Sequence, residues 1–264
     1  MNETLVKYLA GLLDADGSLS FSFKADPNRP GRHFVGLALK LSSSSAVDRH
    51  GFIPSLPSLT GMGATMKDGR SEKFFSWNVC RRADLEMLLP RLIKHMVVKA
   101  KHWNWIFAQW RGLRSDAKTV SDEMRDELKA LSRTSRRENV GPLKPKNHPT
   151  WAWLAGYLDG DGTYHFRRYS NQWHILVSAV AHINDIVVLE FLQKAFGGYI
   201  AEQGKSDDVK VWRRALGARN ASFALAFLPH LAKHSRMKRH KINAIIHHHR
   251  QRLSVQSAEA QATV

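Results

Sequence analysis

One nine-residue sequence occurs twice in this chain, and the repetition limits the possible folds more than any other feature. It begins at Leu9 as Leu-Ala-Gly-Leu-Leu-Asp-Ala-Asp-Gly and at Leu154 as Leu-Ala-Gly-Tyr-Leu-Asp-Gly-Asp-Gly, with seven identical residues. The same spacing of proline, lysine and asparagine recurs later in each copy, at Pro90, Lys99 and Asn104 and at Pro229, Lys238 and Asn243. We therefore expect two copies of one structural unit in a single chain.

A segment rich in charge and proline separates the two copies. It covers residues 134–149 and includes Pro142, Pro145 and Pro149, a composition typical of a linker. The chain then divides into an N-terminal half, residues 1–133, and a C-terminal half, residues 150–253. Residues 254–264 are small and polar without periodicity, so we expect them to form a disordered tail.

Both copies predict the same order of helices and strands. A helix ends at the Asp-x-Asp-Gly sequence, and the strand that follows alternates apolar Leu19, Phe21 and Phe23 with polar residues. Such alternation indicates a sheet with one face on a core and one polar face. Further strands are predicted near residues 35–41 and 175–181, with hairpins at 64–79 and 199–216. Each half is therefore predicted to be a small mixed domain of αββαββα type.

The net charge points to a polyanionic partner. The 264 residues include 40 Lys and Arg against 23 Asp and Glu, a net charge of +17. A surplus of this size repels itself unless a polyanion neutralises it, so nucleic acid is the expected partner, and a basic surface without such a partner is the alternative. No apolar run approaches the roughly 18 residues that cross a bilayer, so no membrane partner is expected. The single cysteine, Cys80, has no internal disulfide partner.

Small residues in the repeated helix predict how the two copies meet. Gly11 and Ala15 are four residues apart, as are Gly156 and Gly160, so each helix has a stripe where another backbone can approach closely. Packing along these stripes would bring Asp16 and Asp161 together at two negative helix ends, where a hard divalent cation such as Mg²⁺ relieves the repulsion. The alternative is a plain helix-to-turn sequence in which Gly17 and Gly162 end the helices.

The two motifs and the element order of both halves resemble the single-chain LAGLIDADG homing endonucleases. The resemblance covers about residues 3–110 and 150–252, and it implies an α+β fold whose two antiparallel sheets form a DNA-binding saddle. It also implies that Asp16 and Asp161 are catalytic, metal-binding acids that use Mg²⁺, with Mn²⁺ as a substitute. The implied activity is a double-strand break across the minor groove of a long, roughly palindromic site, leaving short 3′ overhangs and promoting mobility of an intron or intein.

Further catalytic positions follow from the resemblance. Lys99 and Lys238 match a lysine that would stabilise the phosphorane or position the attacking water, and a phosphate-clamping role is the alternative. The polar residue of the second strand falls on Ser43 in the first half and on His182 in the second.

DNA contacts are expected on the polar strand faces, where basic side chains suit guanine edges and some hold phosphates. In the N-terminal half these are Ser18, Ser20, Ser22, Lys24, Lys40, Lys67, Arg70 and Lys73, and in the C-terminal half Thr163, His165, Arg167, Tyr169, Lys210, Arg213 and Arg214. The aromatic residues Trp103, Trp105, Phe107 and Trp110 are expected in the core. His247, His248 and His249 splay around a helix, so they cannot bind one ion together, and a solvated, phosphate-facing helix end is expected there.

The leading hypothesis is a site-specific, metal-dependent DNA endonuclease that acts on double-stranded DNA as a monomer, because both copies are fused in one chain. An intron RNA maturase, with the host intron RNA as partner, and a catalytically inactive DNA-binding regulator are the alternatives. No targeting segment precedes the first motif, so we expect synthesis in an organelle, mitochondrion or chloroplast, or in a bacterial cytoplasm.

Overall fold

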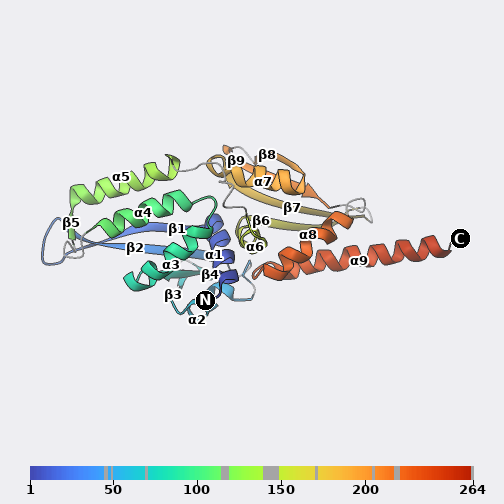
Figure 1. Cartoon of the computed structure of the whole chain (residues 1–264), viewed down its shortest axis with the longest axis horizontal. Helices are drawn as coiled ribbons and strands as arrows, with labels where there is room; N and C mark the ends of the chain where they lie inside the picture. Colours follow the sequence, from blue (N-terminus) through green and yellow to red (C-terminus); the bar gives the residue numbers. More distant parts are fainter. Residues whose placement is uncertain are drawn as a thin grey trace.

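Two halves with the same order of elements make up the molecule (Figure 1). The computed structural model describes residues 1–44, 47–48, 50–68, 71–113, 119–138, 149–169, 172–203, 206–216 and 221–262. The N-terminal half contains α1 (Glu3–Asp16), β1 (Gly17–Ala25), β2 (Arg32–Ser44), α2 (Phe52–Thr60), β3 (Ala64–Asp68), β4 (Ser71–Val79), α3 (Arg82–His95), α4 (Ala100–Gly112), β5 (Thr119–Ser121) and α5 (Asp122–Glu138).

The C-terminal half repeats this order without counterparts of β5 and α5 among its described residues. It contains α6 (Trp151–Gly160), β6 (Gly162–Tyr169), β7 (Gln172–His182), the 3₁₀ helix η2 (Ile183–Asp185), α7 (Val187–Phe196), β8 (Tyr199–Gln203), β9 (Ser206–Ala215), α8 (Ala221–His234) and α9 (Arg239–Ala262). The repeated prolines, Pro90 and Pro229, lie inside the corresponding helices α3 and α8. The predicted α+β fold class with two antiparallel sheets is confirmed.

Each sheet has a covered face and an open face. The strand orders are β1-β2-β4-β3 and β6-β7-β9-β8, with every neighbour antiparallel. Leu19, Leu39 and Leu41 are buried in the core on the helix side of the first sheet, while Ser18 and Lys40 pair with each other on the opposite side and are exposed. We call the side away from the helices the open face, and its polar row follows from the period of two in the strand sequences.

The motif helices α1 and α6 form the joint between the halves (Figure 1). A Cβ placed on Gly11 would lie 1.9 Å from the carbonyl oxygen of Trp153, and one placed on Gly156 would lie 2.0 Å from that of Tyr8. Only glycine permits such an approach, because any side chain would overlap the facing backbone. The predicted contact along the small-residue stripes is therefore confirmed.

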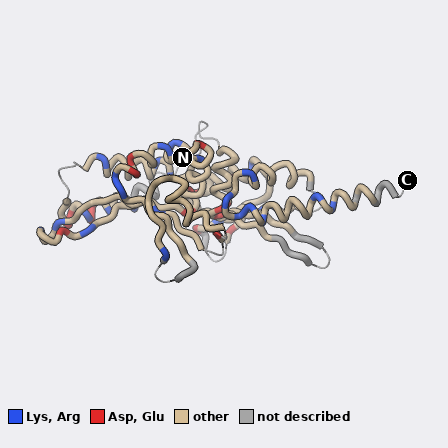
Figure 2. Tube along the Cα trace, turned by 90° about the horizontal axis from the view of Figure 1, so that it is seen from below, with Lys and Arg blue, Asp and Glu red and all other residues tan. Residues whose placement is uncertain are grey.

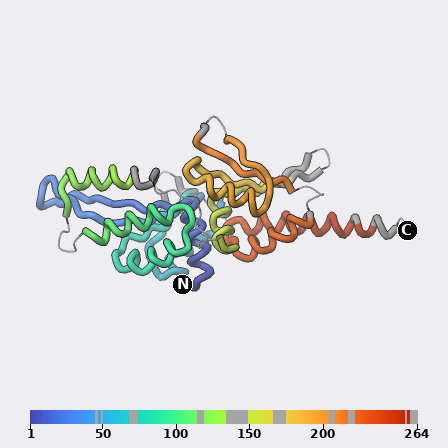
Figure 3. Tube along the Cα trace, turned by 45° about the horizontal axis from the view of Figure 1, so that its top comes forward, coloured from blue at the N-terminus to red at the C-terminus, as the bar shows by residue number. Residues whose placement is uncertain are grey.

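An additional layer covers the end of the β1–β2 hairpin. β5 pairs with the start of β2, and α5 lies along β1 and β2 on the helix side (Figure 3). Lys129 of α5 lies 5.5 Å from the ring centre of Phe23, and Arg125 pairs with Asp122, which also bonds His33 of β2. Helix α5 continues to Glu138 and so includes the first residues of the segment predicted to be a linker. Residues 139–148 lie outside the described residues.

The predicted disordered tail is wrong for most of its length. Helix α9 continues through Ser254 to Ala262 and projects beyond the body of the molecule (Figures 1 and 3). The alanine, glutamine and glutamate residues of this segment favour helix even where no core packs against them, so the lack of periodicity did not exclude a helix.

The core predictions for the aromatic residues hold, whereas the histidine prediction is wrong in part. Trp103, Phe107 and Trp110 are buried and Trp105 packs partly buried against the core. His249 is buried within α9 and does not face solvent, although Lys and Arg recur along this helix (Figure 2). In the part of the chain that the structure describes, no helix is long and apolar enough to cross a membrane.

Candidate active site and DNA-facing surface

Asp16 and Asp161 lie beside each other at the C-terminal ends of the crossed helices. Asp16 is the last residue of α1, and Asp161 caps α6. A Cβ placed on Gly160 would lie 3.0 Å from Oδ2 of Asp16 and 2.5 Å from the Cβ of Ala15. The carboxylate of Asp16 therefore lies over the residue that precedes Asp161, because Gly160 has no side chain to hold the helices apart.

The electrostatics of this pair favour a bound cation. The pKa of Asp161 is raised to about 7, mainly by burial and also by the negative charge of Asp16, while Lys99 and Lys238 act in the opposite direction. Burial also raises the pKa of Asp16, against the lowering effects of Lys238 and Lys99. The ionised form of Asp161 is therefore unfavourable while the charge of Asp16 beside it is not neutralised. A divalent ion bound between the two carboxylates would neutralise both charges.

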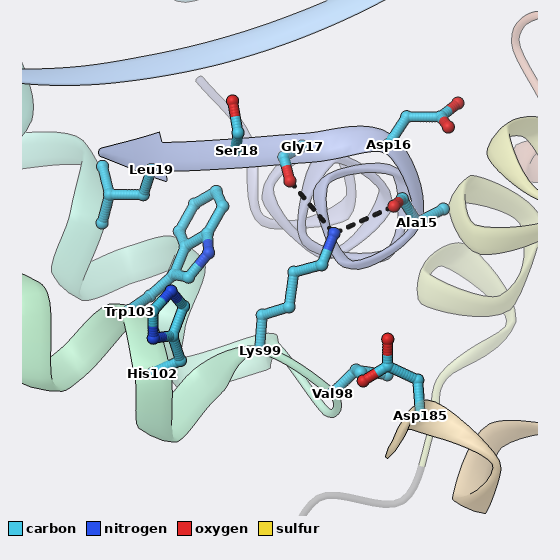
Figure 4. Close-up of a pocket in the computed structure, with 10 residues that line it drawn as sticks. All are labelled: Ala15, Asp16, Gly17, Ser18, Leu19, Val98, Lys99, His102, Trp103 and Asp185. Carbon is cyan, nitrogen blue, oxygen red and sulfur yellow. Dashed lines mark hydrogen bonds between the residues drawn. The ribbon is translucent and has the colours of Figure 1, made fainter. Parts of the chain in front are cut away.

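Lys99 and Lys238 hold the ends of the motif helices. Nζ of Lys99 donates to the carbonyl oxygens of Ala15 at 2.9 Å and Gly17 at 3.0 Å (Figure 4). It also donates to the carbonyl oxygen of Leu13 at 3.1 Å. Nζ of Lys238 donates to the equivalent carbonyls of the second copy, Leu158 at 3.1 Å, Gly160 at 2.9 Å and Gly162 at 2.5 Å. The three N–H donors of each ammonium group are thereby matched by carbonyls at a helix C-terminus, where a positive charge is also favoured.

The first aspartate of each motif is buried and connects three elements. Asp14 accepts from the backbone N–H groups of Val97, Val98 and Lys99 before α4, and from Nε1 of Trp153 in the other half at 2.9 Å. The carboxylate thus ties α1 to its own lysine segment and to the opposite half. Burial raises the pKa of Asp14, and these hydrogen bonds lower it.

Asp159 repeats this arrangement in the C-terminal half. It accepts from the backbone N–H groups of Arg236, Met237 and Lys238, from the Ser235 hydroxyl, and from the hydroxyl of Tyr8 in the other half at 2.7 Å. Tyr8 and Trp153 occupy matching positions in the two copies, so the joint is bonded symmetrically across the crossing point.

A pocket formed by both halves opens beside Asp16. It has a volume of about 340 Å³ and is lined by Asp16, Lys99 and His102 of the N-terminal half and by Asp185 of the C-terminal half (Figure 4). Asp185 raises the pKa of Asp161 as well, so its charge acts at the paired carboxylates. Among the described residues, no three His, Cys, Asp or Glu side chains gather closely enough to hold a metal alone. Two carboxylates are the number that Mg²⁺ commonly takes from a protein when phosphate and water complete its shell, so the pair fits such an ion.

The second-strand positions differ from the expected alignment by one residue. Gly17 pairs with Leu41 and Gly162 pairs with Ala179, which makes Ser44 the counterpart of His182 and Ala181 the counterpart of Ser43. Both predicted residues lie at the ends of their strands, where Ser43 is half-buried and His182 is exposed. A gapped alignment of the two halves cannot detect such an offset, because strand register depends on partners elsewhere in the chain.

Most predicted DNA contacts with described side chains lie on the open face. The register places these side chains there: Ser18, Ser20, Ser22, Lys24, Lys40, Thr163, His165 and Arg213. Arg70 lies outside the described residues, as do the side chains of Lys73, Arg167 and Tyr169.

Three of the predicted DNA-contact residues do not lie on the open face, because their side chains belong to the helix side. Lys67 pairs with Phe75 and Lys210 with Ala181, both in rows that face the helices, and Nζ of Lys210 bonds Oε1 of Glu202 at 2.9 Å. The guanidinium of Arg214 lies 4.8 Å from the ring centre of Phe223 in α8. Arg213 and Arg214 are adjacent in one strand, so they point to opposite faces.

Solved structures share this architecture. The chain aligns with the LAGLIDADG homing endonuclease I-LtrWI bound to target DNA over 96% of its own length and 91% of that chain, with a TM-score of 0.72 and 13% sequence identity. With the LAGLIDADG homing endonuclease I-SmaMI bound to cleaved DNA, it aligns over 98% of its own length and 91% of that chain, with a TM-score of 0.67 and 16% identity. With the LAGLIDADG homing endonuclease I-GzeII in complex with DNA target, it aligns over 91% of its own length and 87% of that chain, with a TM-score of 0.66 and 14% identity. The chain has the fold of the LAGLIDADG homing endonucleases. No protein-family model matches its sequence, and no curated protein does either.

In this LAGLIDADG fold, sequence reasoning missed two kinds of residue at the centre. Asp14 and Asp159 stand in both copies of the motif, two residues before the paired acids, so the duplication itself marked them as repeated carboxylates. Residues two apart on a helix point in different directions, which separates their roles. Asp185 has no repeated sequence around it, and only the packing of one half on the other reveals its place in the pocket.

Proposed function

We propose that this protein is a metal-dependent LAGLIDADG homing endonuclease that cuts both strands of a specific DNA site. The observation that carries this proposal is the meeting of Asp16 and Asp161 at the helix crossing, in the fold that DNA-bound homing endonucleases share. Cleavage would cross the minor groove and leave short 3′ overhangs, and the break would promote mobility of an intron or intein.

The paired carboxylates would hold the metal, for which we propose Mg²⁺ with Mn²⁺ as a substitute. A bound divalent ion would polarise the phosphorus, lower the pKa of the attacking water and stabilise the leaving oxygen. The raised pKa of Asp161 supports this assignment, because the site favours a positive charge between its acids. A structure of I-SmaMI with uncleaved target DNA was obtained in the presence of calcium ions.

The chain's own residues would position this chemistry. Lys99 and Lys238 fix the C-terminal carbonyls of the two motif helices, and Asp14 and Asp159 fix the segments that supply those lysines. The two acids would thereby project from rigid helix ends and not from loops. Rigid placement of both carboxylates would hold a phosphodiester in one geometry. We assign both lysines a positioning role in place of direct phosphate contact, because carbonyl oxygens already accept from each ammonium group.

The open faces would lie in the major groove on either side of the cut. Lys24, Lys40 and Arg213 provide positive charge there, among hydroxyl groups that suit base edges and bridging water. We further propose that the protein acts as a monomer on a target of only rough twofold symmetry, because one chain supplies both halves and their open faces differ. Equilibrium sedimentation that gave an obligate dimer would contradict this part.

Nuclease activity and its metal dependence can be tested on one target. A duplex selected from a random library by binding would be incubated with the protein and Mg²⁺, and we expect two 3′-overhanging ends. Asp16→Asn and Asp161→Asn should each lower double-strand cleavage by at least roughly 10²-fold with little change in binding, since only the carboxylates that hold the metal are altered.

The matched control for these variants is Glu190→Gln, which neutralises an exposed carboxylate on α7. Its cleavage rate should equal that of the wild-type protein. Full cutting by both aspartate variants, or cutting in excess chelator, would refute the proposed site.

A further inference from the structure

The open face of the N-terminal half carries large apolar side chains among its polar ones. Met66 of β3 is 59% exposed and Phe74 of β4 is 46% exposed, although neither belongs to the core. Exposure of two such side chains on one small surface is unfavourable in water, and a contiguous group of this kind commonly marks a binding site.

Strand register places these two side chains next to each other. Met66 pairs directly with Ser76, and Phe74 is two residues from Ser76 on the same strand, so both lie on the open face as diagonal neighbours. Phe74 is also directly opposite Ser44 of β2. We call Met66 and Phe74 the apolar pair.

The surroundings of the apolar pair indicate the chemistry of its partner. Ser42, Ser44 and Ser76 adjoin the pair on the same face, and Lys40 and Asn78 form the next cross-strand row. A protein partner would favour a broader apolar surface, whereas hydroxyl, amide and ammonium groups with one small apolar area suit a polyanion that also presents isolated methyl groups. The major groove of DNA has this composition, because thymine places its C5-methyl group there beside hydrogen-bonding base edges.

We infer that the apolar pair recognises the C5-methyl groups of one or two thymines in the target, and this inference rests on the proposed function. Cytosine at the same place would offer no methyl group and would bring an amino group for which Phe74 has no acceptor and Met66 has only a weakly accepting sulfur. Burial of a methyl group against the pair should therefore favour thymine by about fourfold over the same base without its methyl. The pair determines base preference and takes no part in bond cleavage.

Replacement of thymine by deoxyuridine tests this directly, because it removes only the methyl group. The target is selected from a random duplex library by the full-length protein in Ca²⁺, and each thymine is then replaced singly. We expect one or two positions in one half-site to lose about fourfold in affinity. In Met66→Ala or Phe74→Ala protein, the thymine target should bind as the uracil target does, and the difference should vanish at that position.

Met87→Ala is the matched control, because Met87 is 56% exposed but belongs to helix α3. It should keep the full thymine preference, and all three variants should melt at the wild-type temperature. A selected target without sensitive thymines overturns the inference, as does a thymine preference that survives in both open-face variants. Those two results leave the endonuclease proposal intact, whereas failure to bind any duplex refutes both.

Discussion

The two halves share a frame of backbone-directed contacts but differ in what surrounds it. Asp14 and Asp159 accept from equivalent backbone groups, and Lys99 and Lys238 donate to equivalent carbonyls. Around this frame, only the N-terminal half has α5 and β5 among the described elements. The pocket beside Asp16 receives Asp185 from the other half, and the corresponding turn of the N-terminal half carries His50, whose ring meets that of His240 at 5.6 Å.

This difference shows which interactions tolerate divergence. A contact made to a backbone amide or carbonyl persists whatever side chain its partner residue carries, provided that the chain keeps its course. The contacts of the open faces depend on both side chains and on the target bases, so they are free to change in each half separately. Three sets of variants compare the halves, beginning with the largest expected effect.

The buried aspartates should give the largest loss of stability. Asp14→Ala and Asp159→Ala each leave several buried N–H groups without an acceptor, so we expect a loss of about 3–5 kcal/mol in the free energy of unfolding measured in urea. The loss of stability should be larger for Asp159→Ala, because this change also leaves the Ser235 hydroxyl without its acceptor. Glu190→Ala should change stability by less than about 0.5 kcal/mol. A loss below about 1 kcal/mol for both aspartates would show that the frame is not held by these carboxylates.

The two lysines should separate positioning from direct phosphate contact. Lys99→Met and Lys238→Met should each lower the free energy of unfolding by about 1–3 kcal/mol, with the larger loss at Lys238, whose exposure is only 6%. Both should also slow cleavage, because the helix ends that carry the acids lose their anchor.

Salt dependence of DNA binding measures the phosphate role of the lysines separately. A lysine that contacts phosphate contributes about one unit to the slope of log affinity against log salt concentration. We expect an unchanged slope for Lys99→Met and Lys238→Met, and a slope smaller by about one unit for the open-face control Lys40→Met. A reduced slope in the first two variants would favour phosphate clamping.

The paired acids should differ in how their stability depends on pH. The pKa of Asp161 rises from an ordinary value near 3.8 to about 7 on folding, so its ionisation destabilises the folded state increasingly between about pH 4 and pH 7 and by a constant amount above. Without metal, Asp161→Asn should therefore raise Tm at pH 8, by roughly 2–4 °C for each kcal/mol of repulsion and burial cost that it relieves, and leave Tm nearly unchanged at pH 4.

Addition of Mg²⁺ and DNA should remove this advantage, because only the wild-type pair can bind the ion. In the double variant Asp16→Asn, Asp161→Asn, the increase in Tm should be smaller than the sum of the increases in the two single variants. Each change alone already relieves the repulsion between the two carboxylates. An unchanged Tm at pH 8 in Asp161→Asn, measured by calorimetry, would contradict the proposed coupling of the two carboxylates.

The duplication made the centre of the molecule predictable. Gly11 and Gly156 predicted the close helix contact, and the motif predicted that Asp16 and Asp161 meet, because both features depend on helical spacing alone. The positions of Lys99 and Lys238 were equally visible as a repeat, but their bonds to carbonyls were not. Hydrogen bonds between residues far apart in the chain require the three-dimensional path of both segments.

The strand faces were less predictable than the helices. Where the sequence alternates, as at Ser18 and Ser20, the polar face was identified correctly. Where it does not, as at Arg213 and Arg214, charge alone suggested that both residues contact DNA. The pairing of a strand with its neighbours determines which face each of its residues lies on. A shift of the pairing by one residue moves every side chain to the opposite face.

The crossing at Gly11 and Gly156 has a consequence for which mutations the paired carboxylates can tolerate. Since main chain contacts main chain there, the spacing of the two acids is set by the radii of carbonyl and amide atoms as long as both glycines are kept. Core residues elsewhere can be substituted by residues of other size and shape without changing the spacing of the two acids. A single methyl group at either glycine, by contrast, would force the two helices apart and so separate Asp16 from Asp161.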